Sequence, residues 1–339
     1  MSQGKRQRRA APPLSSFRPD RTMSHSTEVN DIKPTSLSHL IGQRHVIDQV
    51  TVALDAAQQD AKRFDHALMV GPPGLGKSAL ASVIAHEMAT DFHEVLGQSL
   101  NNLADLNALL LSAHDKDIVF IDECHEIKRE NQTALYLALD KQSVFVKGGS
   151  ASPQRIPIGR FSLLLATTDE FCILQPLRDR MKLLLRYEFY SGDELVQILH
   201  HRSRALAWDV DEGLFPEIAQ RSRGTPRLAL RLLQACHRVC RSLGETRITT
   251  NHLQRACKLE QIDTVGLGPN EQQYLDMLAE GPQRLNVLAS RLALPTRTVS
   301  QVIEAFLIRA GLVTKDHLGI RLLTAKGREH FLASRPTDV

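Results

Sequence analysis

The segment from Gly71 to Ser78 constrains the fold of this chain more than any other. It reads Gly-Pro-Pro-Gly-Leu-Gly-Lys-Ser, which is the phosphate-binding P-loop pattern G-x-x-x-x-G-K-S. Its glycines allow the backbone to curl around a phosphate, while Lys77 can reach the outer phosphates and the Ser78 hydroxyl can bind Mg²⁺. An apolar run at 66–70 precedes the loop, and a helix-forming run at 78–88 follows it. This order predicts a strand, a nucleotide-binding loop and a helix.

Size and composition favour a multidomain cytoplasmic protein. The 339 residues are enough for two or three domains, and the apolar fraction of 42% is ordinary for globular proteins. The sequence shows no apolar run near the roughly 20 residues that span a bilayer, and its basic N-terminus lacks the apolar core of a secretory signal. Five scattered cysteines fit a reducing compartment. We expect no membrane partner, and a net charge of +4 permits a nucleic-acid partner without requiring one.

An acidic pair follows the next buried strand and predicts hydrolytic chemistry. The run Asp117–Glu123 contains four apolar residues followed by Asp122 and Glu123. A parallel strand would deliver Asp122 beside the P-loop, where it can hold Mg²⁺, while Glu123 polarises the attacking water. A strand that merely ends in a polar turn is the alternative. The spacing of about 45 residues after the P-loop favours the first interpretation. The acidic pair itself favours a hydrolase over a small-molecule phosphoryl transferase, which needs no residue to activate water.

Three further polar positions have open interpretations. Thr168 ends a buried strand at 161–168 and can hold a water or sense a phosphate, although a strand can simply end in threonine. Arg180 is either a solvated arginine or a finger for the phosphate of a neighbouring subunit. Arg227 follows Gly-Thr-Pro at a predicted helix start, where it is either a surface residue or a phosphate ligand that reaches back from a lid.

The pattern of elements predicts an α/β domain followed by two helical units. Strands and helices alternate up to residue 190, which implies a parallel sheet covered by helices on both faces. A hairpin at 143–159 is either a docking site or ordinary packing. The pattern turns helical at 191–263, with helices near 192–206, 212–221, 225–242 and 250–259. Residues 264–335 predict a winged helix, with helices near 270–279, 284–292 and 296–309 before a β-wing.

Charge alone does not assign DNA binding to the winged helix. From Asp263 onward the chain holds nine basic and eight acidic residues, which is a weak electrostatic footprint. Arg297 lies on the helix expected to face nucleic acid, and Lys315 and Arg321 lie in the wing. Arg291, Lys326 and Arg328 are basic as well, so the residues alone leave the DNA contacts of this unit open.

The combination of motifs resembles the AAA+ ATPases and, more narrowly, the RuvB family of Holliday-junction branch-migration motors. The resemblance spans roughly 33–332. The matching stretches are Gly71–Ser78, Phe120–His125, Ala166–Thr168, Pro176–Arg180, Tyr187–Tyr190, Ser222–Arg227, Ala305–Ile308 and the Gly311-Leu312 wing. It implies an ATPase domain at 37–190, a helical lid at 191–263 and a winged-helix DNA-binding domain at 264–335. Residues 1–36 are rich in Arg, Ser and Pro and lack periodicity, so we expect a disordered basic tail there.

The resemblance also implies ligands and roles. ATP with Mg²⁺ would be hydrolysed between the subunits of a homo-hexamer, with Thr168 as sensor 1, Arg180 as the arginine finger and Arg227 as sensor 2. The hexamer would act on duplex or four-way junction DNA with a RuvA-like junction-binding protein docked on the hairpin 143–159. The nucleotide ligands would be Gly71, Gly74, Leu75, Gly76, Lys77, Ser78, Ala79, Arg180, Tyr190 and Arg227, with Ser78 and Asp122 at the metal.

Several departures from the family pattern leave a second interpretation open. Ala79 stands where the family usually has a second threonine. The wing lacks the usual Thr-Pro-Arg-Gly-Arg run, which leaves Lys315 and Arg321 as its candidate basic contacts with DNA. The hydrolytic residues are intact, whereas the DNA and partner contacts are altered. The alternative is therefore a RuvB paralogue that acts as a DNA- or protein-binding AAA+ switch without translocation.

Overall fold

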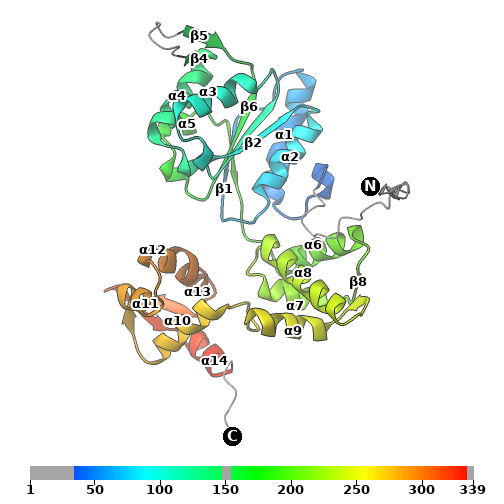
Figure 1. The fold of residues 1–339 in the computed structure, drawn as a ribbon, viewed down its shortest axis with the longest axis vertical. Coiled ribbons are helices and arrows are strands. Elements are labelled where there is room, and N and C mark those ends of the chain that lie inside the picture. The colour runs from blue at the N-terminus through cyan, green and yellow to red at the C-terminus, as the bar shows by residue number, and fades with distance from the viewer. Residues whose placement is uncertain (1–33, 147–153, 334–339) are drawn as a thin grey trace, which may run out of the picture.

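The structure, a computed structural model, describes residues 34–146 and 154–333. These residues form three units in succession, a sheet-containing unit, a helical unit and a small C-terminal unit (Figure 1). The helical and C-terminal units each have a hydrophobic core of their own, and the sheet of the first unit separates two cores. Residues 1–33, which make up most of the expected basic tail, lie outside the described residues.

A five-stranded parallel sheet forms the centre of the first unit, in the order β2-β3-β6-β1-β7. Its inner strands are continuous apolar runs, which suit burial on both faces. The C-terminal ends of β1, β3 and β6 lie side by side, so the residues that follow them share one edge. The strands are β1 Ala67–Val70, β2 Phe92–Leu96, β3 Ile118–Asp122, β6 Ser162–Thr167 and β7 Leu183–Arg186.

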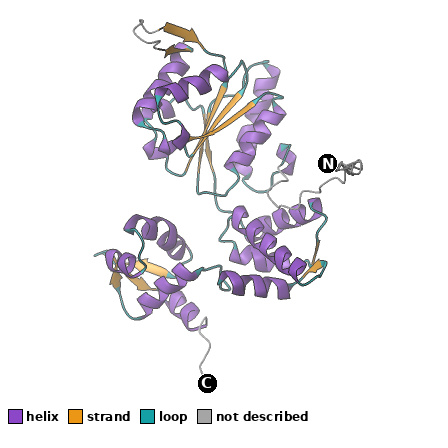
Figure 2. Cartoon of the chain, viewed as in Figure 1, coloured by secondary structure: helices purple, strands orange, loops and turns teal. Residues whose placement is uncertain are grey.

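Helices cover both faces of this sheet, as the alternating pattern predicted (Figure 2). Alternate residues of each strand face opposite sides, so Met69 packs in the core beneath α1 and α2, while Leu68 packs beneath α3 and α4. Each fully buried aliphatic side chain contributes about 1.5–3 kcal/mol to folding. The helices are α1 Arg44–Gln59, α2 Lys77–Glu87, α3 Leu103–Ser112, α4 Arg129–Lys141 and the short α5 Gln175–Arg178.

The expected hairpin extends from this unit as two antiparallel strands, β4 Ser143–Val146 and β5 Gln154–Pro157. Phe145 exposes 56% of its surface there. The expected turn at 148–150 lies outside the described residues, so only the strands of the hairpin are confirmed.

The helical unit contains the four predicted helices, each within two residues of its expected bounds. They are α6 Gly192–Ala205, α7 Leu214–Arg221, α8 Pro226–Ser242 and α9 Thr250–Glu260. A short parallel pair, β8 Asp209–Val210 and β9 Arg247–Ile248, was not predicted. Ser191 begins α6 through a capping box with Glu194, and Pro226 begins α8 where no N–H is needed. Throughout the described residues, the helices are too short or too polar to cross a bilayer.

The C-terminal unit is a winged helix with a three-stranded sheet, in the order β10-β12-β11. The predicted helix at 296–309 forms as a continuous helical run whose middle, Val299–Glu304, has π-helical hydrogen bonding. The sequence interpretation missed β10 and the last helix, α14. The elements are α10 Pro269–Ala279, β10 Gln283–Arg284, α11 Leu285–Arg291, α12 Thr296–Thr298, α13 Ala305–Arg309, β11 Val313–Lys315, β12 Ile320–Leu323 and α14 Ala325–Ala333.

Candidate nucleotide-binding and hydrolysis site

The P-loop joins β1 to α2 in the conformation that its glycines predict. Gly74 and Gly76 have φ angles of 79° and 97°, a left-handed region that glycine enters without strain. The Lys77 ammonium donates hydrogen bonds to the carbonyl oxygens of Gly71 at 2.7 Å and Pro72 at 2.9 Å. Burial lowers the pKa of Lys77, because a charged ammonium loses hydration there. A phosphate bound at the loop would supply the negative charge that this ammonium needs.

Two oxygen ligands suitable for Mg²⁺ meet at the end of the P-loop. The Ser78 hydroxyl, on the first turn of α2, donates to Asp122 Oδ2 at 3.0 Å. Asp122 ends β3, and its other carboxylate oxygen accepts the backbone N–H of Glu123 at 2.9 Å. Mg²⁺ prefers a few carboxylate and hydroxyl oxygens together with water and phosphate oxygens. Ser78 and Asp122 fit that preference, and Mg²⁺ binding between them stays a prediction.

Glu123 lies between the nucleotide pocket and a second, smaller hollow. It lines both the larger pocket described below and a hollow of about 430 Å³. His125 Nδ1 lies 3.4 Å from Glu123 Oε2 and 3.2 Å from the hydroxyl of buried Thr167. Thr168, the predicted sensor, lies just past β6 and lines the smaller hollow with Glu123. The sequence interpretation missed His125, which connects the acidic pair to the end of β6.

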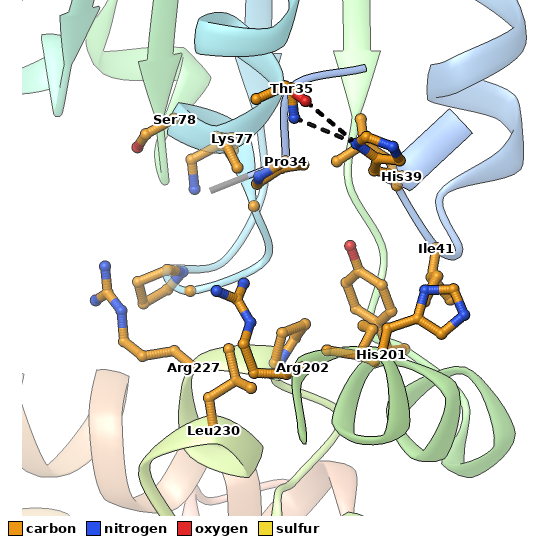
Figure 3. Close-up of a pocket in the computed structure, with 18 of the residues that line it drawn as sticks. Pro34, Thr35, His39, Ile41, Lys77, Ser78, His201, Arg202, Arg227 and Leu230 are labelled. Atoms are coloured by element: carbon orange, nitrogen blue, oxygen red, sulfur yellow. Dashed lines mark hydrogen bonds between the residues drawn. The ribbon is translucent and has the colours of Figure 1, made fainter. Parts of the chain in front are cut away.

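The helical unit closes the opposite side of a pocket of about 770 Å³. Figure 3 shows Lys77 and Ser78 on one side of this pocket, with Arg227, Arg202 and Leu230 on the other. The Arg227 backbone N–H donates to the carbonyl of Gly74 at 3.4 Å, and a Cβ at Gly74 would lie 2.9 Å from Arg227 Cβ. Glycine is therefore required there by close approach as well as by its backbone angle.

Tyr190 connects the start of the helical unit to the P-loop through a hydrogen bond. Its hydroxyl donates to the Leu75 carbonyl at 3.1 Å, and its ring lines the pocket. Burial raises the pKa of Tyr190 to about 12, so the hydroxyl remains a donor at neutral pH. Tyr190, which the resemblance places beside the nucleotide, therefore lies in the wall of the pocket.

The predicted phosphate-binding residues divide into two groups. Lys77, Ser78 and Ala79 line the pocket together with Gly74 and Gly76. Gly71 and Leu75 are not among the described lining residues. The Gly71 carbonyl instead receives the Lys77 ammonium, and the fully buried Leu75 side chain packs in the core beneath α1 and α2.

The sequence interpretation missed most of the apolar and aromatic wall of the pocket. Most of these residues come from the segment before α1 and from α6, which carry no motif of their own, whereas Pro73 belongs to the P-loop and Pro226 and Leu230 belong to α8. Their one signal was the Leu40-Ile41-Gly42-Gln43 run before the first helix. The missed lining residues are Pro34, Thr35, His39, Leu40, Ile41, Pro73, Ile198, His201, Arg202, Ala205, Pro226 and Leu230.

Arg180, the predicted finger, lies away from the pocket of its own chain and is not among its described lining residues. Its Nε donates to Asp140 Oδ1 at 2.7 Å, and its guanidinium lies 4.9 Å from the centre of the Tyr136 ring. The hydrogen bond from Arg180 lowers the pKa of Asp140, because it favours the carboxylate. Whatever phosphate Arg180 serves therefore belongs to another copy of the chain or to no nucleotide at all.

The three predicted DNA contacts have different surroundings. Arg297 is exposed and donates to Gln301 Oε1 at 3.0 Å. Arg321 donates to Glu304 Oε2 at 2.8 Å, and the Lys315 ammonium lies 2.5 Å from Glu304 Oε1. The Glu304 side chain is 1% exposed and that of Arg321 11%. The wing thus turns two of its basic groups onto an internal carboxylate.

Glu304 remains a carboxylate because of this network. Burial alone would raise its pKa, but hydrogen bonds from Arg321, Lys315 and the Tyr274 hydroxyl outweigh that effect and lower the pKa overall. The Tyr274 hydroxyl donates at 2.9 Å. Arg321 is therefore part of a hydrogen-bond network inside the winged helix, whereas Arg297 faces solvent.

Family models match all three units of the chain. The P-loop domain of the Holliday junction DNA helicase RuvB matches residues 32–187. The RuvB AAA lid domain matches residues 190–263, and the RuvB C-terminal winged helix domain matches residues 264–332.

Curated relatives and solved structures agree with these matches. The chain is 35% identical to the Holliday junction branch migration complex subunit RuvB of Kosmotoga olearia, over 90% of this chain and 91% of that protein. Its identity to the Thermotoga maritima subunit is 34%, over 94% and 97% of the two chains. The structure of the Thermotoga maritima RuvB branch migration motor superposes with a TM-score of 0.78 at 33% identity, covering 90% of this chain and 99% of that one. The chain belongs to the RuvB family of AAA+ ATPases.

Proposed function

We propose that this chain is an ATP-dependent DNA motor that drives branch migration of Holliday junctions in recombination and repair. The observation that carries the proposal is the pocket in which the P-loop, the acidic pair at the end of β3 and Arg227 of the helical unit meet. The names of its relatives, subunits of Holliday junction branch migration complexes, supply the DNA substrate.

In this proposal each group has one task in hydrolysis. Lys77 and the P-loop amides bind the β- and γ-phosphates, while Ser78 and Asp122 would hold Mg²⁺, which would supply positive charge beside the phosphates. Glu123 orients and polarises the attacking water, and Thr168 lies at the neighbouring strand end, where it can hold that water. Arg227 brings a positive charge from the lid, so hydrolysis changes the contact between the lid and the ATPase domain.

Arg180 completes the site from a neighbouring subunit. Its distance from the pocket of its own chain supports a role in trans, because a guanidinium held by Asp140 and Tyr136 cannot serve the nucleotide of the same chain. A ring in which each subunit lends Arg180 to the next accounts for this placement, and six subunits are the number that the family resemblance implies. The ring is a cytoplasmic homo-hexamer in this proposal.

The winged helix and the hairpin supply the contacts with DNA and partner. Arg297 is the exposed candidate phosphate ligand, and Lys315 is a weaker one because its ammonium pairs with Glu304. A RuvA-like junction-binding protein docks on the hairpin 143–159, where Phe145 is exposed. The domains of the motor are 37–190, 191–263 and 264–335, after a tail at 1–36.

Hydrolysis and junction movement test this function directly. ATP hydrolysis is measured with and without a synthetic four-way junction, and branch migration is followed with the same labelled junction. We expect DNA to stimulate hydrolysis, and Arg180→Ala to abolish both activities. Hydrolysis that ignores DNA, or that survives the loss of Arg180, would contradict a ring motor and leave the switch as the alternative.

A further inference from the structure

The turn between α7 and α8, residues 221–227, touches both the nucleotide pocket and the winged helix. At its second half, Arg227 and Thr225 lie against Gly74 of the P-loop. The Gly224 carbonyl accepts the backbone N–H of Tyr190 at 2.9 Å, and the Tyr190 hydroxyl reaches the P-loop at Leu75. This half of the turn therefore contacts the pocket wall.

The first half of the same turn holds the winged helix. Arg223 donates through Nε to the Gly266 carbonyl at 2.8 Å and through a terminal nitrogen to Glu271 of α10 at 2.7 Å. A Cβ at Gly266 would lie 2.1 Å from the Arg221 carbonyl oxygen, so the linker to the winged helix passes directly against the turn. Arg223 has a φ of 54°, a region that most residues avoid. Contacts on two sides hold it there.

Arg309 at the end of α13 extends this contact to the junction between the ATPase domain and the lid. Its guanidinium carbon lies 3.3 Å from the centre of the Phe189 ring, and Phe189 directly precedes Tyr190. The same guanidinium donates to the Arg223 carbonyl at 2.9 Å. Phe306 lies beneath both arginines, 4.6 Å from Arg223 and 5.3 Å from Arg309. We call Phe189, Arg223, Phe306 and Arg309 the Arg–Phe cluster.

The Arg–Phe cluster joins all three units through charge on aromatic faces. The negative face of an aromatic ring attracts a guanidinium, most strongly where water is partly excluded. Loss of hydration and the nearby charge of Arg223 lower the pKa of Arg309. Both guanidinium groups lie over the Phe306 ring, and Arg223 also pairs with Glu271 of α10, so a shift of the winged helix would change the surroundings of Arg223.

We propose that the Arg–Phe cluster couples the winged helix to the nucleotide site, with Arg309 and Phe189 as positioning residues. DNA held by the winged helix acts on Arg223 through this cluster, and the turn passes the change to Arg227 and Tyr190. The proposal rests on the proposed function, since it takes the winged helix as the DNA-binding unit. Coupling between two ligands is reciprocal, so nucleotide must alter DNA affinity by the factor with which DNA alters nucleotide affinity.

The first test replaces Arg309 by alanine and uses Arg291→Ala as the matched control, because Arg291 pairs with exposed Glu280 on the same unit. ATP hydrolysis without DNA and the affinity for a fluorescent nucleotide should stay at the wild-type level. The stimulation by a four-way junction, and the change in junction affinity on adding a non-hydrolysable ATP analogue, should each fall about fivefold or more. The control should retain both couplings.

A second variant distinguishes a loss of coupling from misfolding of the first variant. Phe189→Leu keeps an apolar side chain but removes the aromatic face, and it should reproduce the loss of coupling. Because both changes break one contact, the double variant should lose little more than either single variant. Unchanged coupling in both single variants, or equal losses of basal hydrolysis and nucleotide affinity, would overturn the proposal.

A readout without DNA separates this proposal from the function on which it rests. Hydrogen exchange of residues 265–275 and 304–312 is measured with and without the ATP analogue in the full-length protein. We expect nucleotide to change exchange there in the wild type and not in Arg309→Ala. If the wild type shows this change but no stimulation by DNA, the motor fails and the coupling stands. If DNA stimulates hydrolysis but neither readout depends on Arg309, the coupling fails and the motor stands.

Discussion

The nucleotide pocket and the wing both contain basic side chains that the sequence singled out, yet they direct these side chains differently. In the pocket, Lys77 and Arg227 line an open space with Glu123. In the wing, Arg321 and Lys315 turn onto Glu304, which is almost completely buried. Lys77 and Arg227, each in a tightly spaced motif, thus face an open pocket, whereas Arg321 and Lys315, assigned from the type of unit alone, pair with a carboxylate inside the fold.

The largest effect should come from the pocket. Glu123→Gln removes the carboxylate proposed to activate water but keeps the shape of the side chain, so hydrolysis should fall about 100-fold or more. ATP binding should persist, because the P-loop and Lys77 are untouched. Glu126→Gln is the control, since Glu126 is the neighbouring carboxylate and lies 3.4 Å from the other nitrogen of His125. Equal losses in the two variants would show that Glu123 has no special role.

A loss of stability should show that the basic residues of the wing support the fold of the winged helix. Glu304→Gln leaves the largely buried Arg321 without its carboxylate, which should cost about 3 kcal/mol in the unfolding free energy of the winged helix. Urea unfolding, with hydrogen exchange of residues 269–333, measures this cost. Glu280→Gln, at the exposed pair with Arg291, should change little. If Glu304→Gln is as stable as the wild type, the pairing of Glu304 with Arg321 and Lys315 does not stabilise the fold.

DNA affinity should distinguish the exposed Arg297 from Lys315, which pairs with Glu304. Arg297→Ala should weaken binding to the four-way junction at every sequence and reduce the salt dependence of binding by about one counterion. Lys315→Ala should have a smaller effect, because the Lys315 ammonium is already paired with Glu304. A titration of junction binding at several salt concentrations measures both. A larger loss from Lys315→Ala would reverse the comparison between these positions.

The smallest effect should appear in the pH dependence of the wing. The pKa of Glu304 is lowered in the folded protein, so its charge stabilises the fold above the ordinary glutamate pKa of about 4.3, and this contribution disappears as the pH falls through the lowered value. The stability difference between the wild type and Glu304→Gln should therefore be full at neutral pH and shrink below about pH 4. A difference that is constant with pH would show that charge is not its source.

Local patterns predicted the fold and the core of the pocket. Glycine spacing and a four-residue apolar run ending in an acidic pair are read within single segments, so the P-loop, β3 and their side chains followed from the sequence. The helices of the lid followed from their spacing of apolar residues. The strand β7 was missed because leucines favour helices, and its place beside β1 is a tertiary choice.

Contacts between distant segments could not be predicted in the same way. His125 meets Thr167, Arg180 meets Asp140 and Arg321 meets Glu304 across separations of 42, 40 and 17 residues. Each pairing depends on how strands and helices pack, and no local spacing encodes it. For this reason the sequence could name Arg180 and Arg321 as candidates but could not show that each is held by a carboxylate of its own chain.

Mixed rings test most directly whether each nucleotide site is shared between two subunits. Arg180→Ala and Glu123→Gln subunits carry different affinity tags, are co-expressed, and are purified through both tags, so that every ring contains both. Single-turnover hydrolysis is then compared with that of the two pure variants. If Arg180 acts in trans, about a quarter of the sites are intact in an equal random mixture, and hydrolysis should return to that extent. Mixed rings as inactive as both pure variants would contradict the claim, because every chain would then lack a group that its own site needs.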